Sequence, residues 1–319
     1  MDIEYLLWLQ GLRETYGGET FVTLITEIPK SPLSALIPGI LFWCFDKKAG
    51  LFILFVTSFG RMLNQLIKDT FCVYRPWILD SQVQPTADTL KKASSFSMPS
   101  GHTQMATAIY GGLAYFYRKK YPLLIIPCVL IILVTGISRN FLGAHTPQDV
   151  LVAIIETVVV MLLADKLFSL IERDRIYGTA TFLVGIIFCV AALVYITTKS
   201  YPIDYVDGKI IVDPVKAVQD SVDGVGCALG FLIGWILERR FVNFSTKVDK
   251  QTKIRRVIIS CLVGAVVLSV IYTFKFLGLI LIHEFLKGFL PLVTILFLAP
   301  LAFDYCERKN LLKKFSWFR

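Results

Sequence analysis

The side chains with the clearest capacity for catalysis are two histidines, each in a short polar segment beside a long apolar run. His102 ends the tetrapeptide Pro-Ser-Gly-His, and His145 lies between Arg139 and Asp149. Histidine changes its protonation state near neutral pH and can act as a nucleophile or as a general acid. We therefore expect these two imidazoles to carry out a group-transfer reaction.

Three basic side chains accompany the histidines and indicate an anionic substrate. Lys68 and Arg75 belong to one polar segment and Arg139 to another. An arginine guanidinium matches two oxygens of a phosphate, and a lysine ammonium adds a compact positive charge. Ser100 suits the N-cap of a helix, and with Gly101 it would turn free backbone N–H groups toward the same anion. Because Gly101 lacks a side chain, its backbone can also approach a ligand closely.

Asp149 follows His145 in the pattern His-x3-Asp, near the expected start of a helix. Thr146 can cap that helix with Pro147 at its first position, so Asp149 falls in the first turn. From there its carboxylate can hold one imidazole nitrogen of His145 and leave the other free to attack phosphorus. Two histidines with one aspartate and no neighbouring cysteine make a poor metal site, so we expect neither a metal nor another cofactor.

The elements that must position these residues are long apolar helices. Hydrophobic residues make up 55% of the 319 residues and charged residues only 18%, whereas soluble domains average about 25% charged. A helix of about 20 apolar residues crosses a bilayer, and the runs here lack the polar face of a soluble helical core. We predict an all-α polytopic transmembrane helical bundle. The expected spans are 31–45, 49–68, 101–117, 122–138, 147–165, 178–198, 223–238, 255–274 and 277–303.

The chain divides into three regions by composition. Residues 1–30 predict an amphipathic segment at the membrane surface, and residues 31–200 a core of six spans. Residues 201–319 hold about three additional C-terminal spans and a basic cytoplasmic tail; these spans could line a substrate groove, form a homodimer interface or serve a structural role. The long polar loop 69–100 is expected to cover the site, and Asp-Gly between alternating apolar residues in loop 199–222 predicts a hairpin.

The loops fall on two faces of opposite character. The face with loops 46–48, 118–121, 166–177 and 239–254 and the C-terminus collects most of the 33 Lys and Arg residues. Short basic loops remain in the cytoplasm, so this face and the C-terminus are expected to be cytoplasmic. The histidine segments then lie on the non-cytoplasmic face. Attraction to anionic lipid head groups accounts for the net charge of +9, and no nucleic-acid partner is expected.

The polar segments, in order, are Lys-x6-Arg-Pro, Pro-Ser-Gly-His and Ser-Arg-x5-His-x3-Asp. Together they resemble the three-part signature of the type 2 phosphatidic acid phosphatase superfamily. That family includes lipid phosphate phosphatases, undecaprenyl pyrophosphate phosphatases, glucose-6-phosphatase and vanadium haloperoxidases. The resemblance covers about residues 30–165 and says nothing specific about residues 201–319.

The resemblance implies a role for each matching residue. His145 would form a phosphohistidine intermediate, Asp149 would orient it, and His102 would protonate the leaving group. No metal would be required, because cations of the chain would neutralise the phosphoryl group. The residues that would hold the phosphoryl oxygens are Lys68, Arg75, Ser100, Gly101 and Arg139. Trp77, just after Arg75 and Pro76, is a further candidate for contact with the substrate.

The expected substrate is a lipid phosphate or pyrophosphate in a bacterial inner (plasma) membrane. Undecaprenyl pyrophosphate is our first expectation, and phosphatidate or phosphatidylglycerophosphate the second. A soluble sugar phosphate is the alternative, because glucose-6-phosphatase bears the same signature. Phosphate transfer to a lipid or sugar acceptor stays open, whereas a non-catalytic binder or transporter is disfavoured by the full set of catalytic residues. The long spans argue against a haloperoxidase.

Overall fold

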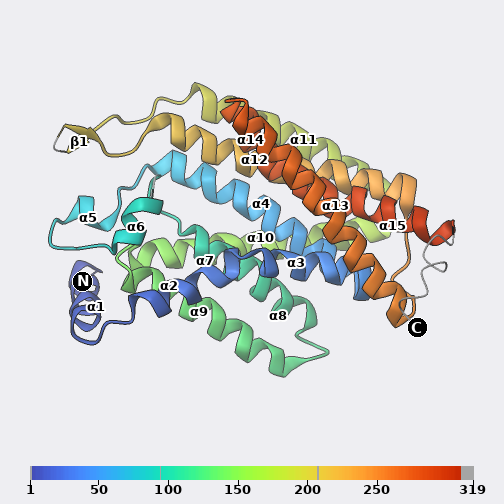
Figure 1. Ribbon diagram of the computed structural model, residues 1–319, viewed down its shortest axis with the longest axis horizontal. Coiled ribbons are helices and arrows are strands. Elements are labelled where there is room, and N and C mark those ends of the chain that lie inside the picture. The colour runs from blue at the N-terminus through green and yellow to red at the C-terminus, as the bar shows by residue number, and fades with distance from the viewer. Residues whose placement is uncertain (1, 94, 207, 310–319) are drawn as a thin grey trace.

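The computed structural model describes residues 2–93, 95–206 and 208–309, and this part of the chain is almost entirely helical (Figure 1). The predicted all-α fold is confirmed. Short 3₁₀ or π turns join some helices: η1 (Ile28–Lys30), η2 (Leu41–Phe45), η3 (Thr107–Gly111), η4 (Pro122–Leu124), η5 (Glu238–Val242) and η6 (Thr294–Leu298). The helices are α1 (Asp2–Tyr16), α2 (Glu19–Glu27), α3 (Pro32–Ile40), α4 (Lys47–Phe71), α5 (Pro76–Leu79), α6 (Ala87–Lys92), α7 (Gly101–Ala106), α8 (Gly112–Tyr117), α9 (Ile125–Phe141), α10 (Pro147–Arg173), α11 (Arg175–Thr198), α12 (Pro214–Leu237), α13 (Lys250–Phe276), α14 (Ile280–Val293) and α15 (Ala299–Arg308).

Polar side chains set where the long helices begin. The Asp46 carboxylate accepts hydrogen bonds from the backbone N–H groups of Lys48 and Ala49 and so caps α4. Thr146 and Asp149 form a reciprocal capping box at the start of α10. These caps satisfy N–H groups that have no partner within the helix. The cap of α10 fixes the helix start in the segment that holds His145 and Asp149, and the cap of α4 fixes the start of the helix whose last turn carries Lys68.

Seven continuous helical runs in the described part of the chain are long and apolar enough to cross a membrane. The other two expected spans, 101–117 and 147–165, are also helical, as α7 to α8 and as α10, but they are not among the seven. Seven of the nine expected spans therefore meet this measure of length and composition, and the total number of spans stays a prediction. Both exceptions carry polar residues inward, including the buried Glu156 of α10. The seven runs are Glu19–Phe45, Lys47–Leu79, Pro122–Phe141, Ile176–Thr198, Pro214–Val242, Lys250–Phe276 and Ile280–Arg308.

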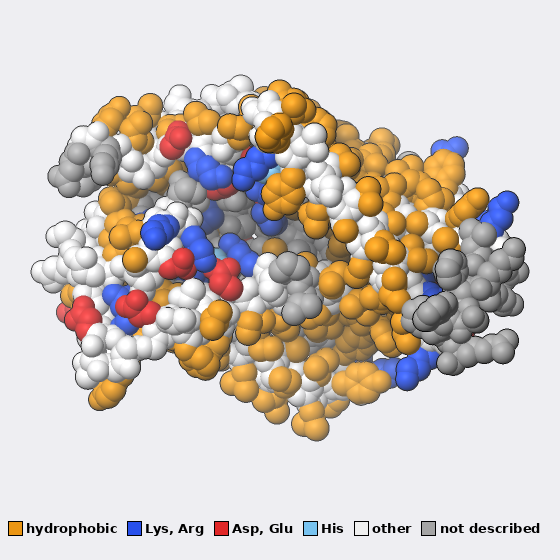
Figure 2. Space-filling view, viewed as in Figure 1, with side chains coloured by type: hydrophobic (Ala, Val, Ile, Leu, Met, Phe, Trp, Pro, Cys, Tyr) orange, Lys and Arg blue, Asp and Glu red, His pale blue; other side chains and the backbone are white. Residues whose placement is uncertain are grey.

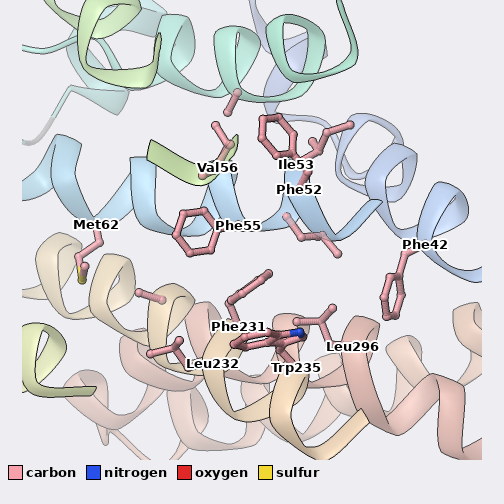
Figure 3. Close-up of a cluster of buried hydrophobic side chains, with 14 of the residues drawn as sticks. Phe42, Phe52, Ile53, Phe55, Val56, Met62, Phe231, Leu232, Trp235 and Leu296 are labelled. Carbon is pink, nitrogen blue, oxygen red and sulfur yellow. The ribbon is translucent and has the colours of Figure 1, made fainter. Parts of the chain in front are cut away.

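Helix α4 is the centre of the bundle and packs against both the core and the C-terminal helices. Phe52, Phe55 and Met62 of α4 are buried together with Phe231 and Trp235 of α12 (Figure 3). The rings of Phe55 and Phe231 meet edge to face with centroids 5.4 Å apart. Aromatic pairs in this geometry add about 0.5–1.5 kcal/mol beyond the burial of their surface. The C-terminal helices are thus part of the same hydrophobic core as the helix that carries Lys68.

Helices α12 and α14 pack with their backbones in close approach because glycines face each other. A Cβ atom added at Gly226 or Gly230 would lie within 3.0 Å of a backbone carbonyl oxygen of α14, that of Phe285 or Phe289. A Cβ added at Gly288 would collide in the same way with the carbonyl oxygen of Asp223. Small residues allow membrane helices this proximity. The two helices therefore form a rigid pair along one side of α4.

Helices α1 and α15 lie at opposite ends of the molecule (Figure 1). Helices α1, α5 and α6 gather at the N-terminal end together with the predicted hairpin. That hairpin is confirmed: strand β1 (Tyr205–Val206) pairs antiparallel with β2 (Lys209–Ile210). Helix α12 begins at Pro214, earlier than its expected span. The limits of the three regions and the membrane-surface position of residues 1–30 stay predictions.

Candidate active site

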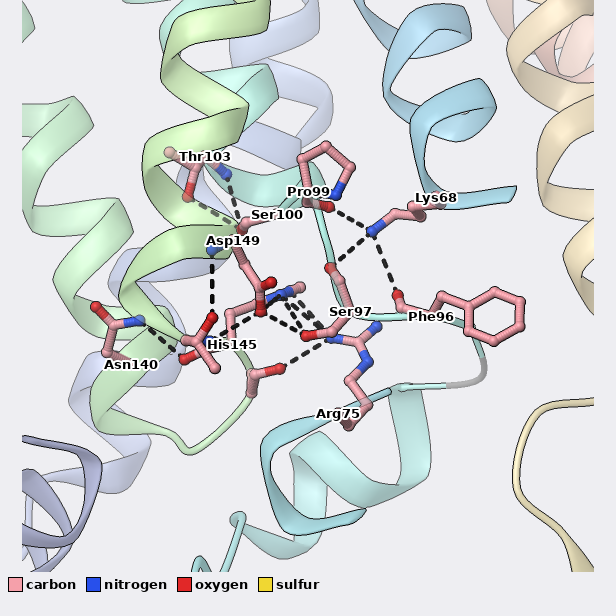
Figure 4. Close-up of polar contacts among 12 residues, drawn as sticks. Lys68, Arg75, Phe96, Ser97, Pro99, Ser100, Thr103, Asn140, His145 and Asp149 are labelled. Carbon is pink, nitrogen blue, oxygen red and sulfur yellow. Dashed lines mark hydrogen bonds and ion pairs between the residues drawn. The ribbon is translucent and has the colours of Figure 1, made fainter. Parts of the chain in front are cut away.

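The predicted polar segments meet at the end of the bundle that carries α5 and α6 (Figure 4). They surround a cavity of about 570 Å³. The end of α4, the loop before α7 and the turn between α9 and α10 each contribute side chains. The predicted residues that line the cavity are Lys68, Arg75, Gly101, His102, Arg139 and His145. Ser100 and Asp149 are buried directly behind them.

The turn between α9 and α10 is closed by its own hydrogen bonds, which place His145. The Ala144 N–H donates to the carbonyl oxygen of Arg139 at 3.0 Å. The Asn140 side-chain amide donates to the carbonyl oxygen of His145 at 2.8 Å. Gly143 has a φ of +70°, a backbone conformation that suits glycine. The imidazole is therefore fixed by a short, internally bonded turn.

Asp149 holds His145 from behind, as the spacing predicts. Its Oδ2 lies 3.3 Å from Nδ1 of His145 and accepts the backbone N–H of Thr146 at 2.8 Å. The same oxygen accepts the hydroxyl of Ser97 at 2.5 Å. A carboxylate that accepts hydrogen bonds from several donors is fixed in place. It can accordingly orient the ring through Nδ1.

Arg75 meets the other side of the same ring. Its Nη1 donates to Nε2 of His145 at 3.0 Å and to the carbonyl oxygen of Ala144 at 2.9 Å. A guanidinium has no lone pair to offer, so Nε2 must be the acceptor and the ring proton belongs on Nδ1, toward Asp149. Burial, together with the charges of Arg75 and Lys68, lowers the pKa of His145 well below its usual value. The ring of His145 lines the cavity, and its Nε2 lone pair accepts the hydrogen bond of Arg75.

Lys68 and Ser100 are fixed by the backbone around the start of α7. The Lys68 ammonium donates to the carbonyl oxygens of Ser97, at 3.0 Å, and of Pro99. Ser100 caps α7, and its hydroxyl accepts from the hydroxyl of Thr103 at 3.0 Å. These bonds hold an uncompensated positive charge next to the positive end of a helix. Both features favour a bound anion.

Gly101 keeps part of the cavity open. A Cβ atom added there would lie no closer than 3.8 Å to another side chain, and the nearest atom is Nζ of Lys30. A larger side chain would therefore extend toward the cavity and not into packed protein. The absence of a side chain at Gly101 leaves room for a ligand beside Lys30, as the sequence predicts for a close approach of ligand to backbone.

His102 and Arg139 have polar atoms that no protein group satisfies. Within the described ranges, Nε of Arg139 and Nε2 of His102 are buried and have no hydrogen-bond partner. The nearest acid to His102 is Glu27, whose Oε1 lies 3.6 Å from Nε2. A buried N–H group without an acceptor costs about 1–3 kcal/mol, so such atoms mark the place of a ligand. Both residues line the cavity.

Three residues of the site escaped the sequence patterns. Ser97 lies just before the Pro-Ser-Gly-His segment, and its contact with Asp149 could have been suspected from its proximity alone. Glu27 and Lys30 come from the first apolar run, far from any motif, and no signal in the sequence links them to the histidines. Conversely, Trp77 in α5 is half-buried and is not among the residues that line the cavity. The cavity gives no support to a direct contact by Trp77.

The arrangement suits attack on phosphorus. The neutral imidazole of His145 has one unprotonated nitrogen, Nε2, which becomes available when the guanidinium of Arg75 turns its hydrogen bond to a phosphoryl oxygen. Lys68, Arg75 and Arg139 make the cavity positive, and a second imidazole, His102, lines the same space. In the part of the chain that the structure describes, no three His, Cys, Asp or Glu side chains gather as metal ligands would. The absence of a metal requirement stays a prediction.

Comparison with known proteins gives the same family as the motifs. The family model described as the PAP2 superfamily matches residues 49–170, and that of a PAP2 superfamily phosphatase transmembrane extension matches residues 222–309. Phosphatidylglycerophosphatase B of Bacillus subtilis (strain 168) is 36% identical over 152 residues, which cover 44% of this chain and 70% of the relative. The crystal structure of a transmembrane PAP2 type phosphatidylglycerolphosphate phosphatase from Bacillus subtilis aligns over 53% of this chain and 87% of its own, with 28% identity and a TM-score of 0.42. This chain therefore belongs to the PAP2 superfamily and is a membrane-embedded lipid phosphatase, a hydrolase of phosphoric esters.

Proposed function

We propose that this phosphatase hydrolyses the terminal phosphate monoester of a glycerolipid of the phosphatidylglycerophosphate type through a phosphohistidine intermediate. The observation that carries the mechanism is the position of His145, with Nδ1 against Asp149 and Nε2 turned toward a cation-lined cavity. The substrate follows from the relative in Bacillus subtilis that is named phosphatidylglycerophosphatase B.

In the first step the Nε2 lone pair of His145 attacks phosphorus. A P–N bond forms while the P–O bond to the lipid breaks, and His102 gives its proton to the departing oxygen. Asp149 stabilises the positive charge that develops on the ring through Nδ1. Lys68, Arg75 and Arg139 take up the negative charge on the phosphoryl oxygens, the task that Mg²⁺ performs in other phosphoryl-transfer enzymes.

In the second step water replaces the imidazole. His102, now neutral, removes a proton from the water as its oxygen attacks phosphorus. The P–N bond breaks, inorganic phosphate forms, and His145 returns to its neutral state. Both histidines end in the protonation states with which they began, so the cycle balances.

We assign the site to the non-cytoplasmic face of a bacterial inner membrane. The cavity lies at the end of the bundle opposite α15, and Figure 2 displays basic side chains at the end that carries α15. Short basic loops favour a cytoplasmic position for the C-terminal end. A homodimer stays a prediction.

Phosphate release from matched lipids tests this proposal. Full-length protein in detergent receives phosphatidylglycerophosphate, phosphatidate, undecaprenyl pyrophosphate and glucose 6-phosphate, with and without EDTA. We expect the highest kcat/KM with the first lipid, no effect of EDTA, and inhibition by vanadate. Preference for undecaprenyl pyrophosphate would support our earlier expectation for the substrate, and labelled acceptor in place of free phosphate would indicate a transferase.

His145→Ala tests the nucleophile. Substrate labelled in the terminal phosphate should leave acid-labile label on the wild-type protein after rapid quenching and none on the variant. Hydrolysis should fall by at least about a thousandfold, as for the loss of catalytic nucleophiles elsewhere. Lys91→Met, an exposed cation of α6 outside the cavity lining, is the matched control. Unchanged turnover in a folded His145→Ala protein would refute the assignment.

A further inference from the structure

The cavity is not made by the catalytic core alone. Beyond His145 and the phosphate-binding cations it is lined by Lys216, Asp220 and Asp223 of α12 and by Lys287 of α14. The transmembrane extension matches residues 222–309, which include Asp223 and Lys287, whereas Lys216 and Asp220 lie just before it in α12. Figure 2 shows Lys, Arg, Asp and Glu side chains gathered around a hollow in the same half of the molecule. Helices α12 and α14 therefore supply one wall of the space that a substrate would fill.

The charges of this wall are paired. The Lys216 ammonium lies 3.0 Å from Oδ1 of Asp220, and Lys287 contacts Glu284 one helical turn away. Arg61 of α4 forms an ion pair with Asp223, which is almost fully buried. We call this set of three ion pairs the extension wall. It offers hydrogen-bond donors and acceptors side by side with little net charge.

The catalytic side of the cavity has the opposite character. Among the described residues, Lys68, Arg75 and Arg139 form no ion pair within 4.0 Å, and Arg139 has a buried Nε without any acceptor. Unpaired cations suit a phosphoryl group. A wall of ion pairs does not suit a second anion, because its carboxylates would repel the anion. It suits hydroxyl groups, which can donate to a carboxylate and accept from an ammonium.

The extension wall is held rigidly enough to distinguish one ligand from another. The glycine contacts between α12 and α14 fix these two helices to each other, and the Arg61–Asp223 pair joins α12 to the helix that carries Lys68. A polar group on rigid helices loses little entropy when a ligand binds. The distance between the catalytic side and the wall is then set by the fold.

We infer that the extension wall is a subsite for an uncharged, hydroxylated part of the lipid head group, next to the phosphoryl group that is removed. Lys216 and Asp220 contact the hydroxyl, and Lys287 completes the wall. The inference rests on the proposed function, because it takes His145 as the place of the phosphoryl group. It assigns the C-terminal helices a role in substrate selection.

A pair of lipids that differ by one hydroxyl tests this subsite. The first is dioleoyl phosphatidylglycerophosphate, and the second is the same lipid with the central hydroxyl of its terminal glycerol replaced by hydrogen. Wild-type full-length protein in detergent should favour the first by about tenfold in kcat/KM, the usual effect of one hydrogen bond to a charged group. A ratio near one in the wild type would overturn the inference.

Two variants locate the effect. Asp220→Asn and Lys216→Met should each bring the ratio of the two lipids close to one, whereas Lys91→Met should leave it at the wild-type value. Unchanged ratios in both variants would place the selectivity elsewhere and overturn the inference. A rise in kcat/KM for both lipids in Asp220→Asn would mean that the wall meets an anion, which also overturns it. A separate measurement tests the proposed function. If the His145→Ala variant still hydrolyses phosphatidate, the proposed function fails, whatever the ratio of the two lipids.

Discussion

The guanidinium of Arg75 donates to Nε2 of His145 at 3.0 Å, while the carboxylate of Asp149 lies 3.3 Å from the opposite nitrogen of the ring. One imidazole is thus held between a cation and an anion. This order fixes the tautomer that a nucleophile needs, because the cation can only approach a free lone pair. The same cation also keeps the ring neutral, which has a measurable consequence.

The acid limb of the pH profile should lie well below the ordinary histidine value. Burial and the charge of Arg75 lower the pKa of His145 from 6.5, so the reactive neutral form persists as the solution becomes more acidic. We expect kcat/KM to remain level as the pH falls through 6.5 and to decline only at lower pH. Arg75→Gln removes one cause of the shift and should move the decline to higher pH. A decline of kcat/KM centred at pH 6.5 in the wild type would contradict the lowered pKa of His145.

Ser97 should act as a positioning residue through Asp149. Its hydroxyl donates to Oδ2 of Asp149 at 2.5 Å, and Ser97→Ala removes that donor. The carboxylate then interacts more strongly with a protonated His145, so the acid limb should move to higher pH. We expect kcat to fall about tenfold with little change in KM, and Ser97→Thr to restore both, as for other residues that support a catalytic group. A change in kcat without any movement of the limb would indicate a purely structural role.

Glu27 should support His102 in the role of acid. Burial and the charge of Lys30 lower the pKa of His102 well below its usual value. The carboxylate of Glu27 lies 3.6 Å from Nε2 of His102 and opposes this shift, because it favours the protonated imidazole. Glu27→Gln should therefore move the alkaline limb of the profile to lower pH, because the acid loses its proton sooner. The measurement is kcat against pH with one lipid substrate. Glu14→Gln, an exposed carboxylate of α1, is the control and should leave the limb unchanged.

Gly230 should be essential for the packing of α12 on α14. Gly230→Ala would press a methyl group against the carbonyl oxygen of Phe289, whereas Gly264 of α13 has open space around it. We expect Gly230→Ala to destabilise the protein by about 1–3 kcal/mol, as other overpacked sites do. Gly264→Ala should be neutral or stabilise by up to about 1 kcal/mol. Equal thermal midpoints for the two variants would contradict the close approach of the helices.

The sequence predicted those residues of the site that belong to local motifs. Lys68, Arg75, His102 and His145 belong to motifs whose spacing and order are read directly from the chain, and the structure brings them to one cavity. Lys30, in the first apolar run, could not be predicted in this way. Its position depends on which helix faces which, a property of tertiary packing and not of local composition.

The helices and the hairpin of the fold were also predictable from the sequence. The long apolar runs predicted the helices, and the Asp-Gly pair between alternating apolar residues predicted the hairpin. Seven of the nine expected spans are long and apolar enough to cross a membrane, and the two over α10 and over α7 to α8, although helical, stay predictions. The lining of the cavity by Lys216 and Lys287 could not be predicted either, since it depends on which helices face the cavity and not on the local sequence.

The unpartnered guanidinium nitrogen of Arg139 has a consequence for the empty protein. Lys68, Arg75 and Arg139 repel one another in a buried space, and only an anion relieves that repulsion. Inorganic phosphate, the product, has the required charge, and a ligand that binds only the folded state raises its stability. The bundle is thus most resistant to unfolding while its product is bound. The attraction that stabilises the folded protein also slows the release of phosphate. Tighter phosphate binding by these three side chains therefore raises stability and lowers turnover.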